Sequence, residues 1–296
     1  MSDTAPAPVL RDPGPGLVVL EPGRAELFQE LDALFAGIAA ELSGRPVLGP
    51  ALLPASGLAR LDYFRNFPHL GISAARFDEA AIEQLSAGTA PQELGPGSAA
   101  PTGFLLPSAT CYGLLLSLEG AEVGPGLRLT AVGRCFRNET HYEGLRRLWG
   151  FHMREVLYVG TQDGAREHLA RSKELILALA ADLGLELGFE PANDPFYDKD
   201  GSRAKLTRLD PVKHEFTAPD GTAIASVNRH RNFFGERLAL TSDGATAHSA
   251  CTAFGVERWV HAMLLAHGDA ARALARVTAV RTARAAGSAR TAEPAT

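Results

Sequence analysis

The sequence has few of the features that mark a secreted, membrane-embedded or broadly nucleic-acid-binding protein. It contains three cysteines, an odd and sparse count that argues against a disulfide framework. No apolar run approaches the roughly 18–20 residues that span a bilayer, and the N-terminus lacks the basic and apolar regions of a signal peptide. The net charge of −5 gives no global basic field for nucleic acid. These absences predict a soluble cytoplasmic protein.

The length and composition allow one large folded domain with a small appendage. The chain has 296 residues, of which 46% are hydrophobic, and no internal repeat is visible. Residues 1–18 are rich in Pro, Gly and Ala, so we expect a disordered segment. Residues 269–296 combine Ala with scattered Arg, and we expect a tail that begins as a helix and then has little to bury. The folded domain is therefore predicted to cover 19–268.

Apolar periodicity predicts several helices. Leucine and other apolar residues recur at spacings of three and four across about 23–43, which predicts an amphipathic helix. Thr161 is a candidate N-cap and Gly184 a candidate C-terminal residue for a helix over about 162–183. Further helices are expected at about 57–66, 78–87 and 255–267.

The centre of the chain predicts strands. Leu127–Val132 alternates apolar with small or polar residues and runs into Cys135, and residues 151–159 form a second apolar stretch. The short loop between them indicates an antiparallel hairpin. Short strands are also expected near 185–190, 212–217, 222–228 and 248–253. Helices before and after hairpin-like strands predict an α+β fold around an antiparallel sheet flanked by helices.

Three segments share an order and spacing that point to one chemistry. They are Phe136-Arg137-Asn138-Glu139, Arg147 to Glu155, and Phe254-Gly255-Val256-Glu257-Arg258. Together they resemble motifs two and three of class II aminoacyl-tRNA synthetases, which implies ATP binding and adenylation of a carboxylate. A single F-R-x-E sequence is a weak signal, and the plain alternative makes both arginines ordinary ion-pair partners. The three pieces in order, each in the expected element, are specific.

The resemblance implies that Arg137 and Arg258 are catalytic. Guanidinium groups can bind two phosphate oxygens in one plane and stabilise the charge that builds on the α-phosphate of ATP. The ATP-binding residues implied by the resemblance are Arg137, Glu139, Arg147, Leu148, Phe151, Lys213, Ala225, Ser226, Val227, Asn228 and Arg258. ATP is expected with Mg²⁺, but Ala223 and Ala225 stand where many related enzymes carry an acidic ligand. The magnesium ligands therefore stay open.

Three further segments resemble the zinc-ligand segments of archaeal-type seryl-tRNA synthetases. They are Ala109-Thr110-Cys111-Tyr112, Met153-Arg154-Glu155 and His248-Ser249-Ala250-Cys251. The resemblance implies that Cys111, Glu155 and Cys251 bind Zn²⁺, whose open position takes the substrate's amino group. The separations of 44 and 96 residues show no local metal spacing, and the alternative for each cysteine is a small buried side chain. We expect Cys135 to be a core residue.

The remaining motifs resemble the bacterial amino acid:[carrier protein] ligases, which are truncated homologues of those synthetases. They are Ala192-Asn193-Asp194-Pro195-Phe196-Tyr197, Lys213-His214-Glu215 and Ser226-Val227-Asn228-Arg229-His230. The resemblance covers about residues 60–268 and makes 19–268 a catalytic domain. It implies ATP-dependent activation of a small amino acid, with Gly or Ala favoured, and transfer to the phosphopantetheine thiol of a carrier protein. Arg229, Arg231, Asn232 and Phe233 depart from the residues usual in these ligases.

The same resemblance implies which molecule accepts the aminoacyl group and which oligomer the chain forms. Only about 100 residues precede Cys111, with no long helical arm to grip a tRNA, so a carrier protein is favoured over tRNA. Arg203, Lys205 and Arg208 lie in a basic stretch that could dock an acidic carrier, although an ordinary solvated helix has similar charges. Motif one of class II enzymes forms a homodimer interface, and Phe67–Leu70 is its candidate here. The alternatives are aminoacylation of tRNA or another biosynthetic acceptor, and a catalytically inactive amino-acid-sensing paralogue.

Overall fold

A seven-stranded sheet forms the centre of the molecule. The computed structural model describes residues 10–88, 99–192, 194–198 and 211–291. The strand order is β1-β5-β6-β12-β9-β8-β7, and every pair is antiparallel except β1 with β5. The strands are β1 (Arg45–Pro46), β5 (Gly126–Phe136), β6 (Gly150–Gly160), β12 (His248–Gly255), β9 (Ala223–Arg231), β8 (Lys213–Thr217) and β7 (Gly188–Ala192).

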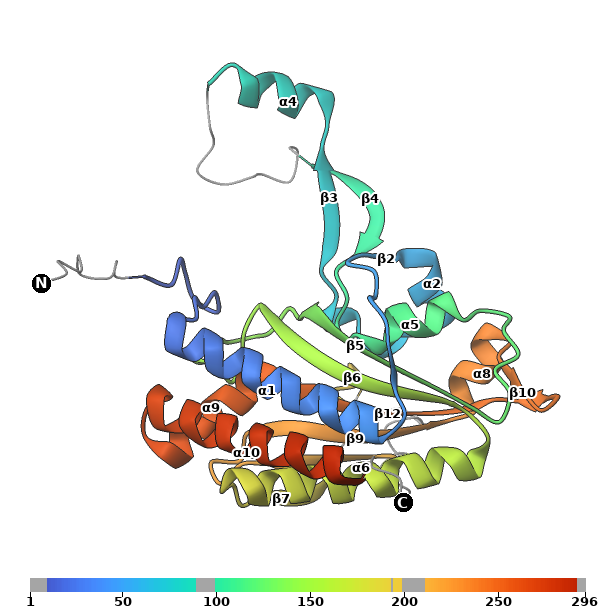
Figure 1. Ribbon diagram of the computed structural model, residues 1–296. Helices are drawn as coiled ribbons and strands as arrows, with labels where there is room; N and C mark the ends of the chain where they lie inside the picture. The colour runs from blue at the N-terminus through green and yellow to red at the C-terminus, as the bar shows by residue number, and fades with distance from the viewer. Residues whose placement is uncertain (1–9, 89–98, 193, 199–210, 292–296) are drawn as a thin grey trace, which may run out of the picture.

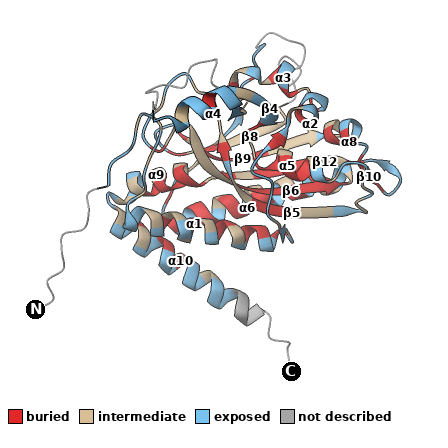
Figure 2. Cartoon of the chain, turned by 90° about the horizontal axis from the view of Figure 1, so that it is seen from above, coloured by how far each residue is buried: buried red, intermediate tan, exposed pale blue. Residues whose placement is uncertain are grey.

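Helices cover one face of this sheet (Figure 1). They are α1 (Pro22–Glu41), α6 (Gln162–Leu183), α9 (Val256–His267) and α10 (Ala270–Thr291). Their apolar stripes and the sheet form the largest core, in which Phe35 stacks on Phe254 at 4.5 Å between ring centroids and Trp259 is fully buried. Each such side chain contributes roughly 1.5–3 kcal/mol on burial. Figure 2 shows that the buried residues follow the strands and the inward sides of these helices.

The opposite face of the sheet carries smaller elements and a second core. Leu115, Leu157 and Leu238 are buried there between the sheet, α5 (Cys111–Ser117) and α8 (Phe233–Leu238). A three-stranded sheet and a β10–β11 pair adjoin this layer, and β3, β4 and α4 project away from the main sheet (Figure 1). The remaining elements are β2 (Leu53–Pro54), α2 (Ala55–Arg60), α3 (Tyr63–Asn66), η1 (Pro68–Leu70), β3 (Ser73–Phe77), α4 (Glu79–Ser86), β4 (Ala99–Leu105), β10 (Thr241–Ser242) and β11 (Ala245–Thr246).

The structure confirms the α+β architecture and the central hairpin. Strands β5 and β6 pair without interruption from Gly126 opposite Gly160 to Phe136 opposite Gly150. Helix α6 begins and ends as predicted, since the Thr161 hydroxyl accepts a hydrogen bond from the Gly164 backbone N at 3.1 Å. At its other end Gly184 has φ 74°, a left-handed conformation that glycine adopts without a Cβ penalty.

The prediction of one helix over 57–66 is wrong. The chain forms two short helices, α2 and α3, and Asp62 between them has φ 53°. A residue in the left-handed region cannot continue a right-handed helix, so the chain turns there. The turn sends α3 toward the cavity described below, where Asn66 and Phe67 lie in the wall.

The described parts of the two terminal regions, residues 10–18 and 269–291, are more ordered than the sequence predicts. From residue 10 onward the N-terminal segment is anchored, because the Trp149 backbone N donates to the Gly16 carbonyl at 3.1 Å. At the other end α10 continues to Thr291 and buries Ala273, Val277 and Val280 in the main core. Spacings of four and three place these side chains on one stripe, so the folded core extends beyond residue 268. None of the helices in the described ranges is both long and apolar enough to cross a membrane.

Candidate active site

A cavity of about 420 Å³ opens on the face of the main sheet that carries α5 and α8. A cavity of this size suits a small-molecule ligand. Among its lining side chains are Arg137, Glu155, Lys213, Cys251 and Arg258. Four of these residues come from strands or strand ends of the sheet, and Arg258 comes from the first turn of α9.

The strand register explains why these side chains meet. Residues directly opposite one another on neighbouring strands point to the same face of a sheet, and so do residues two positions along. Two adjacent rows cross strands β6, β12, β9 and β8. The first row is Glu155, Ala253, Ser226 and Glu215, and the second contains Cys251, Asn228 and Lys213. Most of the chemically active residues therefore face one cavity because of strand pairing.

Cys111, Glu155 and Cys251 come together from α5, β6 and β12. Their ligand atoms all lie within 4.8 Å of one another, and all three residues are buried. Sulfur and oxygen ligands at roughly 2.0–2.3 Å from a tetrahedral zinc are about 3.5–4 Å apart, so this spacing fits Zn²⁺. The Glu155 carboxylate also accepts a hydrogen bond from the Cys111 backbone N, which fixes its orientation.

Burial of this trio opposes ionisation of its members. Burial raises the pKa of Glu155, and the hydrogen bond with Cys111 together with burial raises the pKa of Cys251 well above its ordinary value. A bound divalent cation would offset the cost of the ionised forms. Cys135 lies apart from the trio: burial raises its pKa to about 12, and its thiol lies 3.5 Å from the Thr110 hydroxyl.

Arg137 and Arg258 approach the cavity from different elements. The Arg137 Nε donates to the Ser108 carbonyl at 3.1 Å, and its guanidinium carbon lies 5.1 Å from the centre of the Phe151 ring. Arg258 is largely buried, and burial together with the charge of Arg137 lowers its pKa to about 10. Arg137 and Arg258 thus place two guanidinium groups on the wall of one cavity, an arrangement that suits a phosphate group.

Lys213 contributes a third cation to the cavity. Its Nζ lies 3.2 Å from Asp194 Oδ1 and 3.0 Å from Glu215 Oε1. Burial lowers the pKa of Lys213, but the two carboxylates outweigh burial and raise it. Glu139 and Arg147 pair with each other at 2.6 Å, and neither belongs to the cavity lining.

The other ATP-site candidates divide between the cavity and the core. Phe151, Ser226 and Asn228 line the cavity, and Ala225 belongs both to the lining and to the main core. Val227 instead packs in the core beneath the helices, as the period-two alternation of β9 requires. Leu148 is also buried outside the lining. The candidate carrier-docking residues Arg203, Lys205 and Arg208 lie outside the described residues.

The structure adds residues to which the sequence assigned no role. Asp194 and Glu215 hold Lys213, and Glu257 pairs with His152 across the junction of α9 and β6. Asp194, Glu215 and Glu257 all lie within motif segments of the sequence. Glu215 and Glu257 stand beside Lys213 and Arg258 in the sequence, and this was the available signal, whereas the contact between Asp194 and Lys213 appears only in the fold.

Comparison with known sequences identifies close relatives. The chain is 32% identical over 238 residues to amino acid–[acyl-carrier-protein] ligase 1 of Bradyrhizobium diazoefficiens, covering 75% of this chain and 70% of the relative. It is 29% identical to ligase 2 of the same organism, covering 83% of this chain and 78% of the relative. Type-2 serine–tRNA ligase of Methanocaldococcus jannaschii is 23% identical, and this chain spans 54% of its length. No family model matches the chain.

Solved structures confirm the fold. The seryl-tRNA synthetase of M. kandleri, determined in complex with A. aeolicus tRNASec, has a TM-score of 0.76 and 23% identity. The comparison covers 90% of this chain and 57% of the synthetase chain. The seryl-tRNA synthetase of Pyrococcus horikoshii complexed with ATP has a TM-score of 0.63 and 14% identity. The fold is that of class II aminoacyl-tRNA synthetases, and at 32% identity over most of both sequences this chain belongs to the family of amino acid–[acyl-carrier-protein] ligases.

Proposed function

We propose that this chain activates a small amino acid with ATP and transfers it to the phosphopantetheine thiol of a carrier protein. The observation that carries the proposal is one cavity lined both by the cations Arg137 and Arg258 and by the Cys111–Glu155–Cys251 trio. The first group suits the phosphates of ATP, and the second suits the amino end of an amino acid. The names of the ligases from B. diazoefficiens support the acceptor.

In the first step a carboxylate oxygen of the amino acid attacks the α-phosphorus of ATP. The new P–O bond forms as the bond to pyrophosphate breaks, which leaves an aminoacyl-adenylate. Negative charge grows on the phosphate oxygens, and Arg137 and Arg258 stabilise it in a site shielded from water. We assign the adenine end to Phe151 and Glu139 and another part of the ATP pocket to Arg147, although Glu139 and Arg147 lie outside the cavity lining. Lys213, Ser226 and Asn228 line the remaining wall. ATP would bind as its Mg²⁺ complex, and the ion would supply neutralisation of the phosphate charge.

In the second step the carrier thiol displaces AMP. Its sulfur attacks the acyl carbon, the bond to the phosphate oxygen of AMP breaks, and the thiol proton leaves to solvent. No nucleophile from this chain is needed, because ATP has already activated the carboxylate. The chain's own contribution is to hold the adenylate in place and exclude water.

We assign recognition of the amino group of the amino acid substrate to Cys111, Glu155 and Cys251. Zn²⁺ held by these residues would supply a Lewis acid that accepts only a neutral amine, which favours free α-amino acids. Tyr112 packs edge-on against Tyr63 at 5.8 Å and Phe234 at 6.4 Å, so aromatic rings crowd the region beside Cys111. This crowding supports a small side chain, and we propose Gly or Ala.

The assembly and the domain limits are part of the same proposal. We infer a homodimer from the class II fold, and a catalytic domain that covers 19–268 together with the packed part of α10. The Phe67–Leu70 segment lies at the cavity, where Asn138 Nδ2 donates to the His69 carbonyl at 3.2 Å. A dimer interface nearby would therefore adjoin the active site.

Amino-acid-dependent exchange of pyrophosphate with ATP tests the first step. A screen of all amino acids with the zinc-loaded protein should give exchange with Gly or Ala above the others. Arg137→Ala and Arg258→Ala should each reduce exchange about 10²- to 10³-fold, as loss of a transition-state donor does. Arg134→Ala is the matched control, since this exposed arginine lies on β5, three residues before Arg137, and outside the cavity lining. No exchange with any amino acid would reject the proposal and favour an amino-acid sensor.

A further inference from the structure

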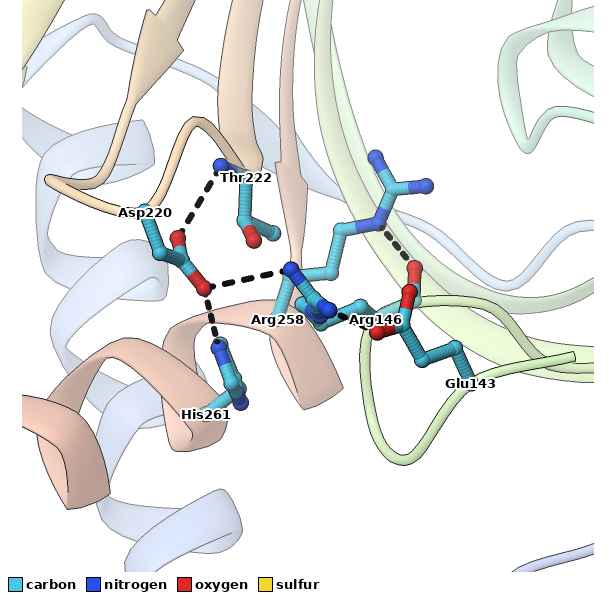
Figure 3. Close-up of polar contacts among 6 residues, drawn as sticks. All are labelled: Glu143, Arg146, Asp220, Thr222, Arg258 and His261. Carbon is cyan, nitrogen blue, oxygen red and sulfur yellow. Dashed lines mark hydrogen bonds and ion pairs between the residues drawn. The ribbon is translucent and has the colours of Figure 1, made fainter.

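Arg258 is anchored by two backbone carbonyl groups, of which Figure 3 shows that of Arg146. Its Nε donates to the Arg146 carbonyl at 2.9 Å, and its Nη1 donates to the Ala223 carbonyl at 2.9 Å. Its Nη2 makes no hydrogen bond to another described residue. The guanidinium is thus held from one side by neutral acceptors, and it lines the cavity without an ion pair to a carboxylate among the described residues.

The two carbonyl groups belong to segments far apart in the sequence. Arg146 lies in the loop between β5 and β6, which closes on itself where the Arg147 backbone N donates to the Glu143 carbonyl at 3.1 Å. Ala223 begins β9, directly after a turn in which the Ala218 backbone N donates to the Thr222 carbonyl at 2.9 Å. Arg258 therefore keeps its position only if the loop, the turn and α9 stay in register.

Asp220 links all three of these elements. Its Oδ1 accepts a hydrogen bond from the Thr222 backbone N at 3.0 Å within the turn. Its Oδ2 lies 3.5 Å from Arg146 Nη1 in the loop and 2.8 Å from His261 Nε2 on α9 (Figure 3). His261 follows Arg258 by three residues, so the two side chains lie on the same side of the helix.

The surroundings of Arg258 explain why such an anchor is needed. Burial and the charge of Arg137 both disfavour the charged guanidinium and lower its pKa to about 10. Asp220 stays ionised: partial burial opposes its ionisation, but hydrogen bonds from His261 and Thr222 lower its pKa to about 2. The ionised Asp220 thus holds together the two segments whose carbonyl groups restrain Arg258, and the nearby charge of Arg137 repels Arg258.

We propose that Asp220 is a positioning residue for ATP, which acts by holding the Arg146 loop and the Thr222 turn where their carbonyl groups orient Arg258. The role in phosphate binding rests on the proposed function. Asp220 itself does not belong to the cavity lining. Any effect of Asp220 on ATP binding must therefore pass through Arg258. The effects of substitutions at the two residues on ATP affinity should then not be additive.

Calorimetric titration with ATP and Mg²⁺ measures this effect without relying on turnover. Asp220→Asn and Arg146→Ala should each weaken ATP binding about tenfold, a typical loss for a hydrogen bond to a charged group. Arg146→Ala removes the side chain but keeps the carbonyl group that Arg258 uses. Asp182→Asn is the matched control, because Asp182 also pairs with an arginine, Arg284 at 2.7 Å, and lies outside the cavity lining.

Double variants separate positioning from a general structural role. Asp220→Asn added to Arg258→Lys should weaken ATP binding no further than Arg258→Lys alone, and zinc content should be unchanged in every variant. Effects that multiply, or Asp220→Asn binding ATP as tightly as wild type, would overturn the proposal. If Asp220→Asn fails to fold, Arg146→Ala with Arg258→Lys decides by the same criterion. If the wild-type protein binds ATP but catalyses no pyrophosphate exchange, only the proposed function is rejected.

Discussion

Glu257 holds His152 at two points: its carboxylate accepts a hydrogen bond from the His152 backbone N at 2.8 Å and pairs with the ring Nδ1 at 2.7 Å. Glu257 is buried in the first turn of α9, and His152 lies on β6. Their chain neighbours are Arg258 and Phe151, which both line the cavity. This pair therefore fixes the helix that carries one candidate ATP-site residue to the strand that carries another.

Replacing Glu257 with Ala should lower both stability and activity. The variant leaves the His152 backbone N without its acceptor, at a cost of about 2–3 kcal/mol in the free energy of unfolding. Urea unfolding measures this loss, and pyrophosphate exchange should fall because Arg258 is no longer fixed. Glu174→Ala is the control: Glu174 is exposed on α6 and pairs only with Arg171 among the described residues. Equal stability of the two variants would refute the structural importance of the Glu257–His152 pair.

Zinc content should depend on two of the three cysteines. Cys111→Ser, Cys251→Ser and Glu155→Gln should each lose bound zinc, measured as metal per chain by elemental analysis. Cys135→Ser should keep it, because Cys135 is equally buried but does not belong to the ligand trio. Removing zinc with a chelator should also lower the melting temperature, since binding to the folded state stabilises it. Retention of zinc by the Cys111 and Cys251 variants would contradict the assignment.

Carrier recognition should respond to charge in the segment that contains Arg203 and Arg208. Arg203→Glu combined with Arg208→Glu should weaken transfer to the carrier by about tenfold or more, since reversed charges repel an acidic partner. Pyrophosphate exchange should stay at the wild-type rate. The double Arg→Lys variant keeps the charge and serves as the control. Parallel loss of exchange and transfer would rule out a role confined to docking.

Stability should fall in acid because of His168. Burial, with a smaller effect from the charge of Arg128, lowers the pKa of His168 from 6.5 to about 4. Between these values the unfolded chain binds a proton that the folded chain does not, so stability decreases as the pH falls. The loss approaches on the order of 3 kcal/mol near pH 4.

Urea unfolding at pH 7.5 and pH 4.5 measures the contribution of His168. In His168→Gln the difference in stability between the two pH values should shrink by most of that amount, while the carboxylates contribute equally in both proteins. An unchanged difference would show that His168 is not protonated on unfolding. Titration of the His168 ring by NMR gives the same answer if the variant proves unstable.

The local signals in the sequence predicted the elements of the fold well. Apolar periodicity predicts α1, and the Thr161 and Gly184 pair predicts both ends of α6, because these signals depend only on neighbouring residues. The break at Asp62 was not predictable, since Asp usually adopts the helical backbone and only occasionally the left-handed one. The burial of Ala273, Val277 and Val280 on α10 was missed because the Ala- and Arg-rich composition hid a short apolar stripe.

Some residues of the candidate site could likewise be predicted from local sequence motifs, whereas others are brought together only by the tertiary structure. The motif segments around Arg137 and Arg258 were visible in the sequence, whereas Cys111, Glu155 and Cys251 are too widely separated for any spacing rule and stood out only by resemblance. Periodicity within β9 separates Ser226 from Val227, but only the strand register shows which face meets the cavity. The contacts of Asp220 join segments 74 and 41 residues away, and nothing in the sequence marks them.

The most direct test of the central claim is the intact mass of a phosphopantetheinylated carrier protein after incubation with this chain, ATP, Mg²⁺, zinc and a small amino acid. The account predicts a mass gain of one aminoacyl group on the carrier that bears the arm. The same carrier without the arm should gain nothing, and Arg258→Ala should abolish the gain. An unmodified carrier under conditions that charge tRNA with the same amino acid would contradict the account.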